Sequence, residues 1–438
     1  MKNSDIQKSN IINRKSIIGI IGLGYVGLPL AIRFSQEKYK VIGFDIDEKK
    51  VNQINSGKSY IQHIPSKDIL SVLANGLVAS SDFSEIAEID VIIICVPTPL
   101  SADNEPDLSY INGTLKNIKS YLKENQLLVL ESTTYPGTTQ EEIVPFINKI
   151  KNKKFTVGNN FFVGYSPERE DPGNKKYSTK NIPKIVSGFT EDCHNLTKSL
   201  YDQVVDNTVS VSSTRVAEMT KIMENIHRAV NIGLVNELKI VADKMDIDIF
   251  EVIDAASTKP FGFTPYYPGP GLGGHCIPID PFYLTWKAKQ YGVNTRFIEL
   301  AGEINTKMPE WVTTKMKDYL IKNGKTMKGA SALVLGVSYK KNVDDTRETP
   351  AFKIIELLQK SNVKVSYNDP FISQLTPTRN YNFDMKGVVL SKENLEKNDL
   401  VILVTDHDIY DYDFIFNHAN CIIDTRGRYV IGNNIIRG

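Results

Sequence analysis

The sequence is poor in cysteine, carries almost no net charge and lacks a long uninterrupted hydrophobic run. Its 438 residues include four cysteines, Cys95, Cys193, Cys276 and Cys421, and no two of them form a C-x-x-C pair. This spacing argues against a zinc ribbon or a disulfide framework, so we expect no metal and reduced thiols in a cytoplasmic protein. The net charge of +1 excludes a broad attraction for nucleic acid or anionic lipid. Any anionic partner must therefore be bound at a local site.

The most apolar stretch, residues 16–32, follows a polar and basic start and resembles a signal peptide or membrane anchor. Glycines and a proline interrupt it, however, and Arg33 closes it after 17 residues, whereas a membrane-spanning helix needs about 20. We therefore expect no membrane segment. The first residues, 1–15, are predicted to form a loosely ordered tail.

The length of the chain predicts more than one domain, because hydrophobic cores stop growing near roughly 250–300 residues. Hydrophobic content of 41% and charged content of 24% are typical of globular proteins. Short apolar runs alternate with segments long enough for helices, which predicts a mainly parallel sheet covered on both faces. The strand candidates are residues 17–21, 40–44, 91–96, 127–130, 161–165 and 184–187.

The pattern becomes helical at residues 212–246 and continues so through 249–256 and 281–322. A second α/β region follows, without a glycine fingerprint. We thus predict an α/β protein with a Rossmann domain at 16–211, a central helical domain at 212–322 and a Rossmann-like domain at 323–438. Strand candidates of the last domain are residues 332–336, 363–367, 400–404 and 421–424.

A dinucleotide-binding motif lies near the start of the chain. Gly22, Gly24 and Gly27 form G-x-G-x-x-G between a predicted strand and a predicted helix. The first glycine allows the tight turn, the second lets the backbone approach a pyrophosphate, and the third lets helix pack on strand. Asp45 ends the next strand and would accept hydrogen bonds from a ribose, which favours NAD over NADP. The alternative is a glycine-rich turn without a ligand.

Cys276 differs in context from the other cysteines, because it lies in a loop rich in proline and glycine. Glycines permit close approach of the backbone to a ligand, and partial exposure is what a reactive thiol needs. Cys95 and Cys421, by contrast, lie in apolar strand patterns that are typical of structural cysteines. A structural loop cysteine remains the alternative for Cys276.

The helix predicted from Thr214 carries four polar residues, Glu218, Lys221, Asn225 and Arg228, within a narrow arc. Either this flank is solvated, or it borders the core and has a function. The apolar set around Val216, Met219 and Met223 is expected to form the core side, with His227 and Lys239 away from the polar flank.

Together, these residues and further motifs resemble the UDP-glucose/GDP-mannose dehydrogenase family over nearly the whole chain from Ser16. The combined motifs are highly specific. They are GLGYVGLP at residues 22–29, VPTP at 96–99, SPER at 166–169, Lys221 with Glu224 and Asn225, GGHC at 273–276 with Asp280, YKK at 339–341 and DTRE at 345–348.

The resemblance implies an NAD-dependent enzyme acting on a UDP-sugar, built as a homodimer or higher homo-oligomer through the central helix. It implies Cys276 as nucleophile, Lys221 as the cation beside the reacting oxygen, and Asp280 and Glu168 for handling protons and water. NAD positions are Gly22, Gly24, Tyr25, Val26, Gly27, Asp45, Lys50, Thr98 and Thr133. UDP-sugar positions are Arg169, Asn225, Arg228, Gly273, Lys340 and Arg347, with Lys259 a looser alignment.

Two departures from the UDP-glucose enzymes favour the branch that oxidises UDP-N-acetylhexosamines. Ile279 stands where those enzymes carry lysine, and REDPG at 169–173 shortens the stretch after Ser-Pro-Glu. The segment SYIQHIPS at 59–66 is similar to UDP-N-acetylglucosamine 6-dehydrogenases, which supply surface polysaccharide precursors. Alternative substrates are UDP-N-acetylgalactosamine, UDP-N-acetylmannosamine and UDP-glucose. Alternative functions are a hydroxyacid dehydrogenase in which Cys276 is incidental, and a non-catalytic NAD-sensing protein.

Overall fold

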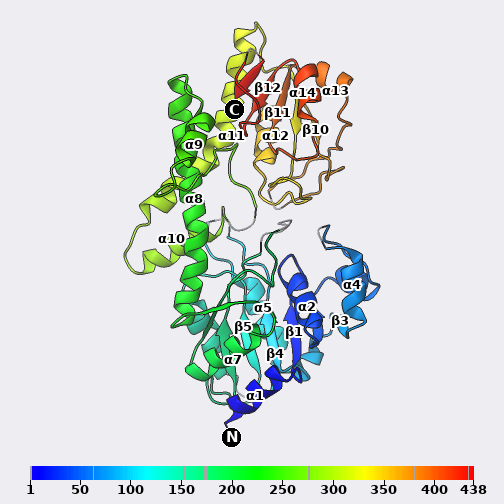
Figure 1. Ribbon diagram of the computed structural model, residues 1–438, viewed down its shortest axis with the longest axis vertical. Helices are drawn as coiled ribbons and strands as arrows, with labels where there is room; N and C mark the ends of the chain where they lie inside the picture. The colour runs from blue at the N-terminus through cyan, green and yellow to red at the C-terminus, as the bar shows by residue number, and fades with distance from the viewer. Residues whose placement is uncertain are drawn as a thin grey trace. The chain divides into compact units, whose positions relative to one another are not determined.

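The computed structural model describes residues 2–62, 64–101, 103, 105–150, 153–170, 176–274, 277–378, 380–432 and 434–438 (Figure 1). The chain divides into two compact units. The N-terminal unit comprises Met1–Glu224 and Phe282–Val293, and the C-terminal unit comprises Asn225–Pro281 and Asn294–Gly438. From the sequence we expected three domains, with boundaries after residues 211 and 322. Because the structure divides into two units and not into three domains, those boundaries stay a prediction.

The N-terminal unit contains an eight-stranded sheet of order β3-β2-β1-β4-β5-β6-β7-β8. Neighbouring strands are parallel except β6 and β7. The central strands are continuous apolar runs, as expected when helices cover both faces. The strands are β1 Ile17–Ile21, β2 Lys40–Phe44, β3 Leu77–Ser80, β4 Val91–Ile94, β5 Leu127–Leu130, β6 Phe162–Tyr165, β7 Lys184–Gly188 and β8 Thr208–Ser210. The helices are α2 Gly27–Gln36, α3 Glu48–Asn55, α4 Ser66–Leu73, α5 Ser109–Ile118, α6 Val144–Asn148 and α7 Glu191–Tyr201, with η1 Phe83–Ala87 and η2 Thr139–Ile143.

The start of the chain is a helix, α1 Asn3–Ile12, so the predicted loosely ordered tail is wrong. Ile11 is fully buried, and its carbonyl accepts a hydrogen bond from the hydroxyl of Tyr39 at 2.7 Å. Gln7 donates to the carbonyl of Asp90 at 3.1 Å. These two contacts, one helical turn apart, fix the helix against the N-terminal unit. They could not be predicted from the segment itself, because its composition is polar.

The C-terminal unit is built on a parallel five-stranded sheet of order β10-β9-β11-β12-β13. Its strands are β9 Ser331–Leu335, β10 Lys364–Asn368, β11 Leu400–Leu403, β12 Ile422–Asp424 and β13 Ile435–Arg437. Its helices are α9 Ile249–Ser257, α11 Arg296–Lys322, α12 Pro350–Lys360, α13 Lys392–Glu396 and α14 Tyr412–His418. Figure 1 shows α12 and α14 beside these strands.

Two helices contribute residues to both units: α8 Thr214–Lys244 and α10 Asp280–Gln290. Burial along α8 reverses the expected pattern. Glu218, Lys221 and Asn225 are buried, whereas Val216, Met219 and Met223 are exposed. The polar flank is therefore the packed side of the helix.

Lys239 is also buried on α8. It follows Lys221 by eighteen residues, and this equals five turns of 3.6 residues, so both lie on the same flank. Our placement of Lys239 away from the flank is wrong. None of the helices in the described part of the chain has the length and apolar character needed to cross a membrane.

Candidate active site

The glycine turn between β1 and α2 has one open position. Gly22 has a φ of +95°, and a Cβ there would lie 2.7 Å from the carbonyl oxygen of Cys95. A Cβ on Gly27 would lie 1.9 Å from the carbonyl oxygen of Gly22, so only glycine allows this close packing. At Gly24, in contrast, an added Cβ would meet no heavy atom within 4 Å. The turn thus leaves room for a ligand where the motif predicts a pyrophosphate.

Asp45 lies beside this turn, at the carboxyl end of β2. It is buried, and Oδ2 accepts a hydrogen bond from the backbone N–H of Leu23 at 3.0 Å. The Nζ atom of Lys50 lies 3.3 Å from the same oxygen. The backbone therefore orients the carboxylate, and an ionised carboxylate can accept further hydrogen bonds from ribose hydroxyls.

Thr98 and Thr133 follow the ends of the next two strands, β4 and β5. Thr98 is buried, and its carbonyl accepts a hydrogen bond from the hydroxyl of Tyr283 in α10 at 2.5 Å. The strand order reverses between β1 and β4, and dinucleotides bind outside the carboxyl ends of strands at such a switch point. Tyr25 and Val26 complete the predicted NAD positions, and Val26 directly precedes α2.

Lys221 and Glu168 form an ion pair in the N-terminal unit. The Nζ atom of Lys221, on α8, lies 3.2 Å from Oε2 of Glu168, which follows β6. Both side chains are nearly removed from solvent, so their interaction is stronger than that of a surface pair. The structure thus brings together two of the four predicted catalytic residues.

Glu218, one turn before Lys221, has a structural role. Its carboxylate accepts hydrogen bonds from the backbone N–H groups of Gly137 at 2.5 Å and Thr139 at 2.9 Å, and from the Thr139 hydroxyl at 2.6 Å. Burial raises the pKa of Glu218 to about 7, although these hydrogen bonds oppose the shift. Glu218 therefore fixes the start of α8 against the segment after β5.

Sequence reasoning missed a buried ion pair next to Glu168. The Nζ atom of Lys184 lies 2.9 Å from Oε2 of Glu131 and also donates to the carbonyl of Pro167 at 3.3 Å. Tyr201 donates its hydroxyl proton to Glu131. This arrangement holds the backbone that carries Glu168. The available signal was a charged residue at the border of each apolar strand pattern, at the end of β5 and the start of β7.

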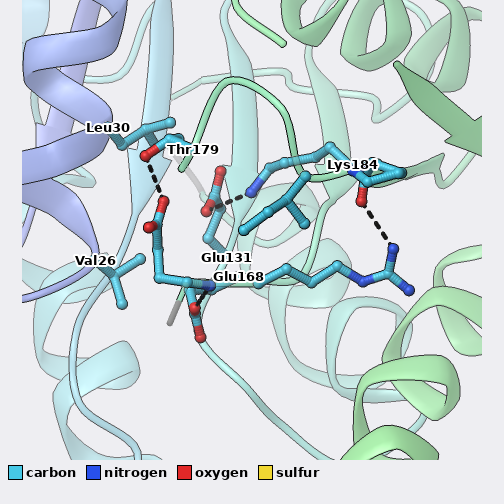
Figure 2. Close-up of a pocket in the computed structure, with 10 residues that line it drawn as sticks. Val26, Leu30, Glu131, Glu168, Thr179 and Lys184 are labelled. Atoms are coloured by element: carbon cyan, nitrogen blue, oxygen red, sulfur yellow. Dashed lines mark hydrogen bonds and ion pairs between the residues drawn. The ribbon is translucent and has the colours of Figure 1, made fainter. Parts of the chain in front are cut away.

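These side chains surround a small pocket of the N-terminal unit. Figure 2 shows Glu131 and Lys184 pointing toward each other there. Burial raises the pKa of Glu170, which accepts a hydrogen bond from Thr179. The lining residues are Val26, Leu30, Glu131, Glu168, Arg169, Glu170, Thr179, Ile182, Pro183 and Lys184.

In the C-terminal unit, Asn225 and Asp280 form a second predicted group. Asn225 donates from Nδ2 to Oδ2 of Asp280 at 2.5 Å, and both side chains are buried. Gly273 and Gly274 precede Cys276, which lies outside the described residues together with His275. Of the two cysteines expected to be structural, Cys421 is buried and Cys95 is partly buried. Burial raises the pKa of the Cys421 thiol to about 11 and that of the Cys95 thiol well above its usual value.

The predicted substrate cations are placed differently from one another. Arg347 makes a bidentate ion pair with Asp345, with 2.6 Å between its Nη2 and Oδ2. Lys340 lies half-buried on the same loop, whereas Arg228 and Lys259 are exposed. Arg169 pairs with Glu224 and donates to the carbonyl of Pro183 at 2.8 Å.

Comparison with known proteins places these features in one family. The UDP-glucose/GDP-mannose dehydrogenase family matches the chain in three parts: its NAD binding domain at residues 16–205, its central domain at 215–307 and its UDP binding domain at 333–430. This order confirms the fold class expected from the sequence. The UDP-N-acetyl-D-glucosamine 6-dehydrogenase of Salmonella typhi is 36% identical over 392 residues, 89% of each chain.

Two further relatives have a different named substrate. The UDP-N-acetyl-D-mannosamine dehydrogenase of Methanococcus aeolicus is 35% identical over 411 residues, 92% of this chain and 86% of that one. The solved structure of the UDP-D-ManNAc dehydrogenase of Pyrococcus horikoshii has a TM-score of 0.85 and 32% identity, covering 96% of this chain and 98% of that one. From these matches, the chain belongs to the UDP-glucose/GDP-mannose dehydrogenase family and is an NAD-dependent UDP-sugar dehydrogenase.

Proposed function

We propose that this enzyme oxidises the 6-hydroxymethyl group of UDP-N-acetylglucosamine to a carboxylate, in two steps and through a thioester on Cys276. The observation that carries the proposal is the buried pair of Lys221 and Glu168 at the carboxyl edge of the NAD-binding sheet. A fixed cation next to a carboxylate can stabilise a developing oxyanion and handle a proton, which both oxidations require. The uronic acid product would supply surface polysaccharide synthesis.

The chemistry follows from the residue types. NAD accepts one hydride in each of the two oxidations, so each sugar consumes two NAD. After the first oxidation, the Cys276 thiolate adds to the aldehyde carbon, and the second oxidation converts the thiohemiacetal to a thioester. Water then cleaves the thioester, releasing the acid and the thiol. This sequence keeps the aldehyde on the enzyme.

The charged residues have separate proposed roles. The Lys221 ammonium stabilises negative charge on the sugar oxygen and on the thiohemiacetal oxygen. Glu168 accepts a proton and orients the water. Asp280 and Asn225 are hydrogen bonded to each other. Asp280 handles protons near the loop that carries the nucleophile, and Asn225 contributes to binding of the UDP-sugar. Lys340 and Arg347 provide positive charge for the diphosphate of the substrate.

The choice of sugar rests on the sequence and on the relatives. REDPG at 169–173 and SYIQHIPS at 59–66 are similar to the N-acetylglucosamine enzymes, and residues 171–175 and His63 lie outside the described part of the chain. The named relatives act on N-acetylglucosamine or N-acetylmannosamine derivatives. Measuring NADH formation with the UDP derivatives of glucose, N-acetylglucosamine, N-acetylgalactosamine and N-acetylmannosamine tests the choice. A higher kcat/KM with any sugar other than N-acetylglucosamine would contradict it.

A cysteine substitution tests the covalent step. Loss of a nucleophile reduces the rate by several powers of ten, about 4 kcal/mol or more of transition-state stabilisation. We expect this loss in Cys276→Ala, whereas Cys276→Ser retains a weak nucleophile that forms a slow ester. The measurement is a single-turnover assay with mass analysis of product and protein. Cys421→Ala, which removes a buried thiol, is the control.

Two outcomes of this assay separate the alternatives. Near-normal uronic acid formation by Cys276→Ala, with two NADH per sugar, would remove the thiol from the mechanism. One NADH per turnover in the wild type would favour the hydroxyacid-type reaction. Steady NADH production with any UDP-sugar excludes a purely NAD-sensing protein.

We also propose that the enzyme is a homodimer assembled through its central helices. On α8, Leu234, Leu238 and Val241 are exposed at spacings of four and three residues, so they form one apolar stripe, and the exposed Met245 directly follows the helix. Such a stripe is typical of an interaction surface. Sedimentation velocity at micromolar concentration would return the mass of a monomer if the proposal were wrong.

A further inference from the structure

A buried polar cluster in the C-terminal unit holds the loop of residues 337–348, called here the β9 loop. The carboxylate of Asp369, directly after β10, accepts hydrogen bonds from the backbone N–H groups of Val337 at 2.8 Å and Ser338 at 3.2 Å. Its Oδ2 atom also lies 3.1 Å from Nε2 of His407. The side chains of Asp369 and His407 are both fully buried. The first part of the loop is thus tied to a carboxylate at the sheet edge.

His407 connects two separate parts of this loop. Its Nδ1 atom accepts a hydrogen bond from the backbone N–H of Asn342 at 2.9 Å, so Nδ1 carries no proton. The proton of a neutral ring is then on Nε2, which faces Asp369 and lies 3.2 Å from Oγ of Ser338. Ser338 donates its own proton to the carbonyl of Lys340 at 2.8 Å. One imidazole therefore holds both ends of the turn that contains Lys340.

The backbone of this turn includes a left-handed residue. Asn342 has a φ of +62°, a conformation that asparagine adopts more readily than most other residues with a side chain. The rings of Phe371 and Tyr410 lie 5.0 and 5.5 Å from the imidazole and limit its rotation. The position of Asn342 is thus set by a ring that cannot move freely.

The β9 loop in turn supports the segment before Cys276. The backbone N–H of Gly274 donates to the carbonyl of Arg347 at 3.0 Å. A Cβ on Gly274 would lie 2.9 Å from the ring of Tyr339, and a Cβ on Gly273 would lie 2.8 Å from Cβ of Tyr339. The two glycines therefore allow the nucleophile segment to lie directly on this loop.

We propose that His407 is a positioning residue that fixes the β9 loop, and through it sets the diphosphate-binding cations and the segment preceding the nucleophile together. The inference rests on the proposed roles of Lys340, Arg347 and Cys276. The Nδ1 atom of His407 accepts a hydrogen bond from the loop residue Asn342, and its Nε2 atom faces Ser338 of the loop and the carboxylate of Asp369. The ring therefore makes specific hydrogen bonds in addition to packing in the core. Binding of the UDP group and reactivity of the thiol are consequently linked through one loop.

Three substitutions separate the two nitrogens. In His407→Asn, the side-chain oxygen can replace Nδ1 as acceptor for Asn342, whereas in His407→Gln the amide can replace Nε2 as donor to Asp369. His407→Leu keeps similar volume and removes both functions. His418→Gln, on α14 at the surface of the same unit, is the control.

Each variant is measured in three ways: UDP affinity by calorimetry, the rate of Cys276 alkylation by iodoacetamide with and without UDP, and the thermal midpoint. We expect His407→Leu to weaken UDP binding roughly tenfold, the effect of losing one or two hydrogen bonds. Its alkylation rate should change several-fold and respond less to UDP than that of the wild type. The Asn and Gln variants should each recover part of both properties, and His418→Gln should match the wild type.

A purely stabilising role would give a different result. If His407→Leu melts earlier but, while folded, binds UDP and reacts with iodoacetamide as the wild type does, the inference is wrong. If that variant does not fold, the Asn and Gln variants decide, and wild-type UDP affinity and alkylation in both would overturn the inference. Failure of the wild-type enzyme to bind UDP would instead contradict the proposed function.

Discussion

The two sheets of this enzyme share a local design and use it differently. In each, a glycine with positive φ directly follows the first strand, +95° at Gly22 and +78° at Gly336. In each, a buried aspartate follows the adjacent parallel strand and accepts hydrogen bonds from the turn. Asp45 accepts from the backbone N–H of Leu23, and Asp369 accepts from that of Val337.

The difference lies in what fills the space next to the aspartate. In the N-terminal unit, Gly24 leaves open space, and the side chain of Lys50 lies beside Asp45. In the C-terminal unit, His407 contacts Asp369, so the same position is occupied by the protein itself. A carboxylate at this place in the fold can thus receive a ligand or hold a loop, and only the local contacts decide between them.

The largest expected effect comes from substitutions in the glycine turn of the N-terminal unit. Gly24→Val should fold normally, because no heavy atom lies within 4 Å of an added Cβ, yet its side chain would occupy the pyrophosphate site and raise the KM for NAD at least about tenfold. Gly27→Ala should instead destabilise the protein by about 1–3 kcal/mol or more, because its Cβ would meet a carbonyl oxygen.

Calorimetric NAD binding and thermal unfolding distinguish these two effects. Gly113→Ala is a matched control, since an added Cβ on Gly113 also meets no heavy atom within 4 Å and the residue lies within α5. Normal NAD affinity in Gly24→Val would show that the turn does not receive the pyrophosphate.

A smaller effect is expected from substituting the two aspartates, and it tests whether they have different roles. Asp45→Ala should lower kcat/KM with NAD by about tenfold, through loss of hydrogen bonds to the ribose, and improve it with NADP. Lys50, now within 3.3 Å of Asp45, would be available to a ribose phosphate. Asp369→Asn should leave the NAD to NADP ratio unchanged and raise the KM for the UDP-sugar. An equal kcat/KM of the wild type with NAD and with NADP would contradict the role of Asp45 in selecting NAD.

The smallest expected change in activity concerns the two buried lysines of α8. Lys221 pairs with Glu168, whereas Lys239 has no hydrogen-bond partner among the described residues. Burial lowers the pKa of Lys239 to about 7, with partial compensation from Asp424. The unfolded chain therefore binds more protons than the folded one between pH 7 and about 10.5, so this group makes stability rise with pH across that window.

Lys239→Met should remove this rise and stabilise the protein by about 1–4 kcal/mol at pH 7, because a buried ammonium is replaced by an apolar group of similar length. Urea unfolding of both proteins at several pH values measures the difference, and NADH formation should stay at the wild-type rate. Lys244→Met, on the exposed end of the same helix, is the control. A Lys239→Met protein with lower stability at pH 7 would show that the ammonium has a stabilising partner.

The sequence predicted the central strands to within two residues, because each is a short apolar run between turn residues. The edge strands β3, β8 and β13 were not predicted, since they have only three or four residues and at least one partly solvated face. The helix α1 was missed because its contacts depend on Tyr39 and Asp90, far along the chain. Local pattern carries little information about such elements.

At the site, the glycine turn and Asp45 can be predicted from sequence spacing alone, because both lie within one β-α-β unit. The buried polar pairs cannot be predicted in this way. Glu131 and Lys184 are 53 positions apart, and Asp369 and His407 are 38 apart. A single sequence shows a charged residue in each place but not its partner. The burial of the polar flank of α8 was likewise decided by what packs against it, and the apolar residues of the same helix gave the opposite indication.

The hydrogen bond from Tyr283 to the carbonyl of Thr98 has a consequence for synthesis on the ribosome. Residues 282–293 belong to the N-terminal unit, although the chain leaves that unit at Glu224. About 70 further residues must therefore be translated before the NAD-binding part receives its last helix. At roughly 5–20 residues per second, this delay amounts to several seconds. During that interval the nascent chain keeps the end of β4 uncovered, so the N-terminal unit cannot mature before part of the C-terminal unit has been made.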